Sequence, residues 1–246
     1  MAKQNIYDNP TFFKGYQRIR ENAVNANNLF EIPALFSLLP DLKGKRVLDL
    51  GCGFGEHCQR FVDLGAEAVV GLDISEKMLT LAKREHSNPK ITYVNLPMED
   101  LDKIEGNFDL VVSSLAFHYV DDFSEVLTKI HEKLTENGLL VFSQEHPINT
   151  CHSGGDRWTR DEDGNRLYAN LAHYGLSGER ESVWFVDNVK KYHRTFSEVI
   201  NDMIATGFSI EKMLEPFPSE DLLKVYPEYA DLQHKPDFLL LKARKV

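Results

Sequence analysis

The sequence is poor in cysteine and has no long apolar run. Its three cysteines, Cys52, Cys58 and Cys151, are an odd number and follow no metal-ligand spacing, so neither a disulfide framework nor a metal site is predicted. No segment approaches the length of a membrane span, and the N-terminus lacks the apolar core of a signal peptide. We therefore expect a cytoplasmic protein without a membrane span.

Basic residues are outnumbered by acidic ones. The chain has 28 Lys and Arg against 38 Asp and Glu, a net charge of -10, and no basic run. This balance argues against sequence-independent binding to the phosphates of nucleic acids. With 246 residues, of which 42% are hydrophobic, and no internal repeat or low-complexity linker, the chain can bury one sizeable core. We expect a single domain, as a monomer or homodimer.

An apolar strand that runs into alternating glycines is the most informative feature of the chain. Residues 46–50 (Arg-Val-Leu-Asp-Leu) predict a strand covered on both faces, and Gly51, Gly53 and Gly55 follow directly. Glycine permits a sharp turn and lets the backbone approach a ligand closely. A second predicted strand ends at Asp73, where a carboxylate can accept hydrogen bonds from both ribose hydroxyls. The pattern predicts a nucleoside site.

The spacing of the glycines indicates which kind of nucleoside binds. Dinucleotide-binding folds use Gly-x-Gly-x-x-Gly, and their third glycine opens a helix that receives a pyrophosphate. Here the third glycine, Gly55, comes one residue early, and Glu56 stands where that pattern needs glycine. A carboxylate at a helix N-terminus repels a diphosphate. The expected ligand therefore lacks phosphates, which disfavours a dinucleotide-dependent oxidoreductase.

These motifs resemble those of the class I S-adenosylmethionine-dependent methyltransferases. The first motif of that family, an acid followed by Gly-x-Gly-x-Gly, is matched by Asp49, Gly51, Gly53 and Gly55. Its second motif, the acid after strand two, is matched by Asp73. The resemblance implies that S-adenosylmethionine is the cofactor and that the glycine loop reaches its methionine part.

The resemblance covers about residues 45–145 strongly and 195–246 more loosely. Within that family, the sequence is similar to the small-molecule branch, which includes the ubiquinone and menaquinone biosynthesis methyltransferases. It implies in-line methyl transfer to a small-molecule acceptor, with S-adenosylhomocysteine released. A non-catalytic S-adenosylmethionine-binding sensor or partner subunit remains the alternative function.

Strands alternate with helices along most of the chain, which predicts parallel β-α units. With the resemblance, this implies an α/β fold with a doubly wound, seven-stranded, mostly parallel sheet, and with a cap inserted between strand five and the following helix. Strand five is expected over 138–143, and the final strand is expected to run antiparallel beside it. We divide the single domain into an N-terminal helical lid (1–40), a cofactor-binding core (41–146), a substrate cap (147–192), and the final helix and strands (193–246).

Several side chains near the two motifs are implied to contact the cofactor. Asp49 is expected to orient the loop and to interact with the cofactor's ammonium, and Cys52 fills a variable position of the motif. Ile74 and Met78 can cover the adenine, although a core role for Met78 is also open. Ser114 matches the position whose backbone contacts the methionyl amine.

Two further cofactor contacts are implied at positions that match the family pattern less closely. Family members place an acid or amide, then a small residue, after strand three, where this sequence has Pro97 and Met98. Adenine would then be recognised by the backbone amides of Met98 and Glu99 or by the Glu99 carboxylate, which can also be a solvated loop acid. Tyr16 or Arg20 can meet the cofactor's carboxylate, or lie on an ordinary surface.

The candidate catalytic residues follow strands four and five. His118 comes a few residues after strand four, whose end faces the departing methyl group in this fold, and Glu145 and His146 end strand five. Any of the three can orient the acceptor or remove its proton. Two alternatives remain open: His118 can cap the following helix, and Glu145 and His146 can form a buried structural pair.

Overall fold

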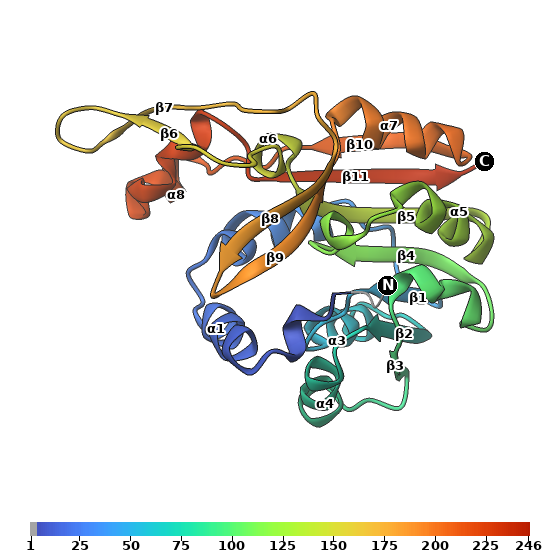
Figure 1. Ribbon diagram of the computed structural model, residues 1–246. Coiled ribbons are helices and arrows are strands. Elements are labelled where there is room, and N and C mark those ends of the chain that lie inside the picture. The colour runs from blue at the N-terminus through green and yellow to red at the C-terminus, as the bar shows by residue number, and fades with distance from the viewer. Residues whose placement is uncertain (1–3) are drawn as a thin grey trace.

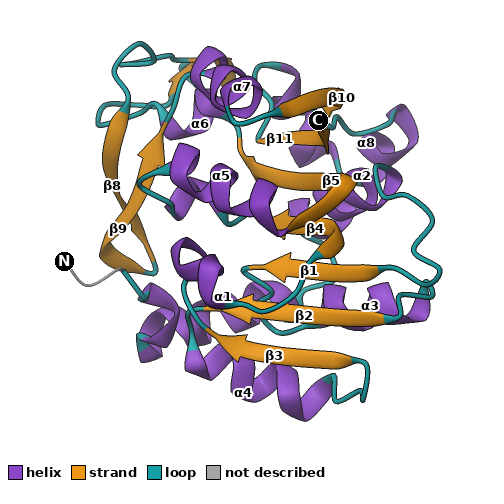
Figure 2. Cartoon of the chain, turned by 90° about the vertical axis from the view of Figure 1, so that its right-hand side faces the viewer, coloured by secondary structure: helices purple, strands orange, loops and turns teal. Residues whose placement is uncertain are grey.

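The computed structural model describes residues 4–246, and its centre is one twisted sheet with helices on both faces (Figures 1 and 2). Seven strands form this sheet in the order β10-β11-β5-β4-β1-β2-β3. Strands β1 to β5 are parallel, whereas β11 is antiparallel to both of its neighbours. The predicted doubly wound fold is confirmed. The strands are β1 (Arg46–Leu50), β2 (Ala68–Asp73), β3 (Ile91–Asn95), β4 (Phe108–Ser114), β5 (Leu134–Glu145), β10 (Phe208–Leu214) and β11 (Phe238–Lys245).

Two apolar cores separate the helices into layers. On one face, α5 and α7 pack against Leu48 and Leu50 of β1. On the other face, α2, α3 and α4 pack in the core that contains Val47. Successive side chains of a strand point to opposite faces, so the apolar run of β1 supplies both cores. The helices are α1 (Pro10–Glu21), α2 (Ile32–Ser37), α3 (Glu56–Asp63), α4 (Glu76–Glu85), α5 (Phe123–Lys133), α6 (Pro147–Thr150), α7 (Phe196–Ala205) and α8 (Glu220–Val225).

Short helical turns complete the chain. A π-helical turn over Asn27–Glu31 leads into α2, so two kinds of helix follow α1 within the segment assigned to the helical lid. Among residues 4–246, no helix combines the length and apolar character needed to cross a membrane. The 3-10 turns are η1 (Ile6–Asp8), η3 (Met98–Lys103), η4 (Phe117–Tyr119) and η5 (Pro227–Gln233).

Residues 147–193 hold α6 and two hairpins that lie outside the main sheet. Figure 1 shows the β6–β7 hairpin extending beside α8, while the β8–β9 hairpin descends toward α1. The aromatic rings of Trp184 and Phe185, at the tip of the second hairpin, pack edge-on against Phe12 of α1 with ring centroids 5.1 and 5.7 Å apart. The hairpin strands are β6 (Trp158–Arg160), β7 (Arg166–Ala169), β8 (Gly178–Trp184) and β9 (Val186–His193).

The chain returns to the sheet through a capped helix. Thr195 precedes α7, and its hydroxyl accepts a hydrogen bond from the backbone N–H of Glu198 at 3.2 Å. The Glu198 carboxylate accepts in turn from the backbone N–H of Thr195 at 2.7 Å. This reciprocal capping box satisfies two backbone donors that the helix leaves open. It fixes the point at which the segment 147–193 ends and the helix that leads back to the main sheet begins.

We predict that Thr195→Ala lowers the free energy of unfolding by about 1 kcal/mol, because the N-cap hydrogen bond is lost. Urea denaturation measures the change. Asn201→Ala, at an exposed position inside the same helix, is the matched control and should be neutral or slightly stabilising. Equal stability of the wild type and Thr195→Ala would contradict the role of the cap.

Candidate functional site

The glycine loop leaves an open space at the carboxyl end of β1. Gly51 and Gly53 adopt positive φ angles of 73° and 53°, a region that other residues rarely enter. A Cβ on Gly51 would lie 2.7 Å from the Cβ of Ala116, so the backbone here passes too close for any side chain. A Cβ on Gly53 would meet no atom within 4 Å. The loop therefore has free volume in front of Gly53.

Asp73 closes this loop from the neighbouring strand. Because β1 and β2 pair in parallel, their carboxyl ends meet, and the backbone N–H of Gly53 donates to Asp73 Oδ2 at 2.9 Å. The N–H of Ser75 donates to Oδ1 at 2.8 Å. Burial raises the pKa of Asp73 to about 6, although both N–H groups oppose the rise. Each carboxylate oxygen still has a lone pair with which to accept a ligand's hydroxyl.

Asp49 lies behind the loop. Its side chain is on the α3 face of β1, and its Oδ2 accepts from the Cys58 thiol at 3.3 Å. Burial raises the pKa of Asp49 to about 7. Cys52 packs beside this pair, since a Cβ on Gly71 would lie 3.0 Å from its sulfur. The expected contact of Asp49 with a cofactor ammonium stays a prediction.

The predicted adenine-side residues gather around the loop. The Met98 methyl lies 3.7 Å from the position of a Cβ on Gly51. Met78 is buried at the start of α4, where its N–H donates to Ser75 Oγ at 3.1 Å. The Ile74 carbonyl accepts from Asn95 at 2.9 Å, and the Glu99 carbonyl accepts from the ammonium of Lys129. A side-chain contact of Glu99 with adenine remains a prediction.

The N-terminal helix lies against the same loop. The Tyr16 ring packs between Phe54 and Trp184, with ring centroids 5.9 and 6.0 Å away. Arg20 forms an ion pair with Glu56, the first residue of α3. Glu56 is the residue that distinguishes this loop from a dinucleotide site, and here it holds a cation of α1. These contacts bring α1 against the glycine loop, and a contact of Tyr16 or Arg20 with the cofactor's carboxylate stays a prediction.

A buried acid that the sequence analysis missed lies between α2 and the sheet. Glu31 is 0% exposed, and its Oε1 accepts from the hydroxyls of Ser114, at 2.9 Å, and Ser143. Its Oε2 has no hydrogen-bond partner among residues 4–246. Burial raises the pKa of Glu31, and the two serine hydroxyls oppose the rise. The available sequence signal was an acid within the otherwise apolar run Leu29–Ile32.

His118 and Glu145 meet at the ends of β4 and β5. The backbone N–H of Glu145 donates to His118 Nδ1 at 3.4 Å, and His118 Nε2 lies 3.9 Å from Glu145 Oε1. Burial lowers the pKa of His118 to about 4, so the ring is neutral at neutral pH. Burial alone would raise the pKa of Glu145, but His118 and the ammonium of Lys191 hold it below its usual range. Lys191, on β9, is the ion-pair partner that the sequence analysis missed.

His146 has partners on both ring nitrogens. Its Nδ1 accepts from the N–H of Ile148 at 3.2 Å and so caps α6, while Nε2 lies 2.9 Å from Glu215 Oε1. Burial lowers its pKa, partly offset by Glu215. The ring therefore joins β5 to the segment after β10. The acid beside His146 is therefore Glu215, whereas Glu145 pairs with Lys191, and a role for His146 as base stays a prediction.

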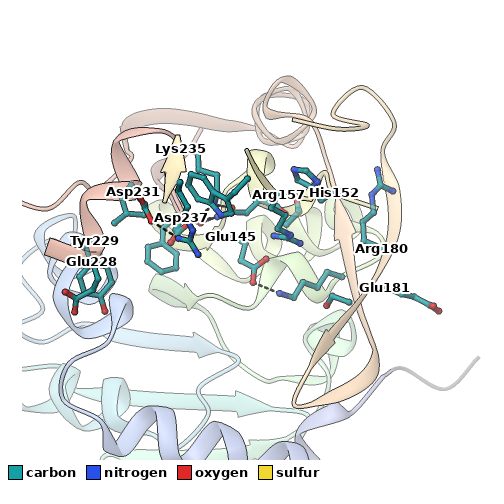
Figure 3. A pocket seen from close by; sticks show the side chains of 18 residues that line it. Glu145, His152, Arg157, Arg180, Glu181, Glu228, Tyr229, Asp231, Lys235 and Asp237 are labelled. Carbon is teal, nitrogen blue, oxygen red and sulfur yellow. Dashed lines mark hydrogen bonds and ion pairs between the residues drawn. The ribbon is translucent and has the colours of Figure 1, made fainter. Parts of the chain in front are cut away.

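A cavity of about 470 Å³ lies beside Glu145 (Figure 3). It is enclosed by the end of β5, the α6 segment, both hairpins, η5 and the start of β11. Figure 3 shows Glu145 among the side chains that line this space, and its carboxylate forms an ion pair with Lys191. The cavity therefore opens next to the side chains that follow strands β4 and β5.

Known proteins resemble this chain in sequence, and solved structures resemble it in fold. Residues 48–142 match a family described as a methyltransferase domain. A crystal structure of an S-adenosylmethionine-dependent methyltransferase from Mesorhizobium loti is 38% identical with a TM-score of 0.79, covering 90% of this chain and 98% of that one. An uncharacterised protein of Haemophilus influenzae is 43% identical over 99% of this chain and 98% of its own length. A ubiquinone biosynthesis O-methyltransferase of Rhodopseudomonas palustris is 34% identical over 102 residues, which are 41% of this chain and 40% of that protein.

The fold and the loop define an α/β enzyme that binds a nucleoside without a diphosphate. With the likeness to the Mesorhizobium loti structure over nearly its whole length, the chain belongs to the S-adenosylmethionine-dependent methyltransferases. Its cofactor is S-adenosylmethionine. The residues present fit this cofactor, because the free volume at Gly53 lies beside an acid with free lone pairs, and the buried Glu31 oxygen lacks a partner within residues 4–246.

We predict that Asp49 makes stability depend on pH. Its pKa is about 7 in the folded chain against an ordinary value of 3.8, so folding takes up a proton between these values. The contribution of Asp49 to the free energy of unfolding therefore falls as pH rises through this range. Asp49→Asn cannot ionise, so its stability relative to the wild type should increase between about pH 4 and pH 7 and level off above that.

Urea denaturation across this pH range measures the difference. The control is Asp63→Asn, at an exposed position on α3, which should keep a constant difference from the wild type. If Asp49→Asn also keeps a constant difference, the buried carboxyl does not titrate as described.

Proposed function

We propose that this methyltransferase acts on a small-molecule acceptor by in-line displacement at the sulfonium methyl group, and releases S-adenosylhomocysteine. The observation that carries the proposal is the cavity of about 470 Å³ beside Glu145. Its volume is in the range of pockets that enclose small ligands. Room for an acceptor also favours an enzyme over a sensor or partner subunit that only binds the cofactor.

The cofactor would lie across the ends of β1, β2 and β4. Asp73 would accept from the two ribose hydroxyls, because each oxygen has one lone pair left after its N–H bond. The backbone at Gly51 and Gly53 would contact the methionine part. Met98, with Ile74 and Met78, would cover the adenine. S-adenosylmethionine supplies a methyl group that its positive sulfur already activates.

Glu31 would face the ammonium of the cofactor. Its Oε1 is fixed by Ser114, whose backbone is the expected amine contact, and its Oε2 is buried without a partner among the described residues. An unpartnered buried oxygen of an acid is costly unless a ligand satisfies it. A ligand with a positive charge and N–H donors would supply what Glu31 lacks.

On the acceptor side, Glu145 would orient the nucleophile and take up its proton. The ammonium of Lys191 keeps its carboxylate ionised, whereas the His118 ring is neutral at neutral pH. His118 would position Glu145, since its Nδ1 accepts from the backbone N–H of that residue. Because the sulfonium is activated, alignment and exclusion of water contribute most to the rate.

Two segments would cover the reacting groups, the lid (1–40) and the cap (147–192). Support comes from the aromatic contacts of Phe12 and Tyr16 with Trp184, which join α1 to the β8–β9 hairpin. The partial likeness to a ubiquinone biosynthesis O-methyltransferase supports the predicted small-molecule branch. That alignment spans 41% of this chain, so it leaves the identity of the acceptor open.

We predict that Asp73→Ala weakens binding of S-adenosylmethionine by at least about tenfold, because two charge-assisted hydrogen bonds to ribose are lost. Isothermal calorimetry measures the affinity. Asp63→Ala, which removes an exposed acid from α3, should bind like the wild type. Unchanged affinity in Asp73→Ala would remove the ribose assignment.

We predict that Glu145→Gln slows methyl transfer by about 10²-fold, in the range that a positioned base contributes, while cofactor affinity stays the same. Formation of S-adenosylhomocysteine with a protein-free extract of small molecules measures the rate. Glu179→Gln, an exposed acid on β8, is the control and should retain full activity. Equal rates for Glu145→Gln and the wild type would exclude Glu145 from the reaction. If the wild type turns over no small molecule in the extract, the proposed acceptor class is contradicted.

A further inference from the structure

We infer that the acceptor is an anion, and that Arg157 holds its carboxylate or phosphate group in the cavity beside Glu145. The inference rests on the proposed function, since it names the chemical class of substrate for the same cavity. It depends on which charges in the cavity are already neutralised within the protein. Three groups of side chains decide this.

Three of the five acids that line the cavity have a cation of their own among the other lining residues. Glu145 pairs with Lys191. Asp231 Oδ2 lies 2.8 Å from Arg166 Nη1, and Asp237 Oδ1 lies 3.0 Å from Lys235 Nζ. These three acids and three cations cancel in pairs. They leave little attraction for a positively charged ligand.

The two remaining acids, Glu181 and Glu228, are exposed. Figure 3 shows Glu181 extending outward from its hairpin, away from the cavity, and Glu228 at the opposite margin. Glu181 is also the cross-strand neighbour of Lys190 in the β8–β9 pair. Both acids are therefore set apart from the centre of the cavity.

Two guanidinium groups remain without a carboxylate partner among the described residues, those of Arg157 and Arg180. Arg180 is occupied by backbone, because its nitrogens donate to the carbonyls of Cys151, Leu176 and Glu179. It contributes positive charge, but each of its three nitrogens already donates to a backbone carbonyl. Its role is to hold the loop before β8.

Arg157 has donors to spare. Its one hydrogen bond to the described residues runs from Nη1 to the carbonyl of Asn149 at 3.3 Å. Figure 3 shows its side chain in the middle of the cavity, above Glu145, and its charge helps to lower the pKa of that carboxylate. The exposed fork of a guanidinium fits a carboxylate or phosphate with two parallel hydrogen bonds.

The arrangement therefore offers two ends to a small molecule. The inner end presents Glu145, beside the expected position of the methyl group. The outer end presents the unpaired charge of Arg157, in a chain whose net charge is -10. Asn149, Thr150 and Ser182 also line the cavity. An anionic group at Arg157 would orient the rest of the acceptor toward Glu145.

Benzoate and phenyl phosphate are suitable probes, with benzamide and phenol as neutral counterparts. We expect calorimetry on the chain loaded with S-adenosylhomocysteine to show binding of at least one anion and at least about tenfold weaker binding of its neutral counterpart. The stronger of the two anions distinguishes a carboxylate site from a phosphate site. Arg157→Gln should weaken binding of that anion by at least about tenfold, because the guanidinium donors are lost.

Arg160→Gln is the matched control, because Arg160 is exposed on the same hairpin but does not line the cavity. It should bind the anions like the wild type, and both variants should bind S-adenosylhomocysteine unchanged. The inference is overturned if neither anion binds, if the neutral compounds bind equally well, or if Arg157→Gln retains full affinity. Loss of S-adenosylhomocysteine binding by the wild type would instead overturn the methyltransferase assignment itself.

Discussion

The hydrogen bond from the backbone N–H of Gly53 to the carboxylate of Asp73 joins the two strands on which the site depends. It exists because β1 and β2 are parallel and in register, which brings both carboxyl ends to one edge of the sheet. It fixes the glycine loop in a conformation with positive φ angles and leaves free volume in front of it. It also keeps a buried acid at the place where a sugar diol can bind.

The other side of the site is organised by charge. Glu31 is fully buried and Glu145 is partly exposed, and their surroundings differ as well. Glu31 is held by two serine hydroxyls and keeps one oxygen without a partner among the described residues, whereas Glu145 has a lysine at its side. The first arrangement suits a cationic ligand, and the second suits an ionised carboxylate that meets an acceptor. A cofactor with a positive charge and an anionic acceptor would thus approach from two differently charged surfaces.

Much of the core could be predicted from the sequence, because local patterns determine it. The predicted strands at 46–50 and 68–73 coincide with β1 and β2, since unbroken apolar runs bounded by glycine or acid have few other structures available. The strand predicted at 138–143 was too short, because β5 runs from Leu134 to Glu145. The hairpins of the insertion were not predicted, because their exposed strands lack a clear apolar alternation.

The site could be predicted only where a motif carries it. The glycines and Asp73 follow one another at a fixed spacing, but Glu31 meets Ser114 and Ser143 across more than eighty residues of chain. No local sequence pattern predicts a contact between residues so far apart in the chain. The same holds for Lys191 beside Glu145, and for His146, whose partner Glu215 lies 69 residues away.

The most direct test of the central claim is a crystal structure of the chain with S-adenosylhomocysteine. The account predicts that both ribose hydroxyls lie within hydrogen-bonding distance of Asp73, that the homocysteine part follows the loop past Gly53, and that the sulfur points toward Glu145 and the adjoining cavity. A structure in which the ribose lies elsewhere, with the Asp73 carboxylate turned away from it, would contradict the account.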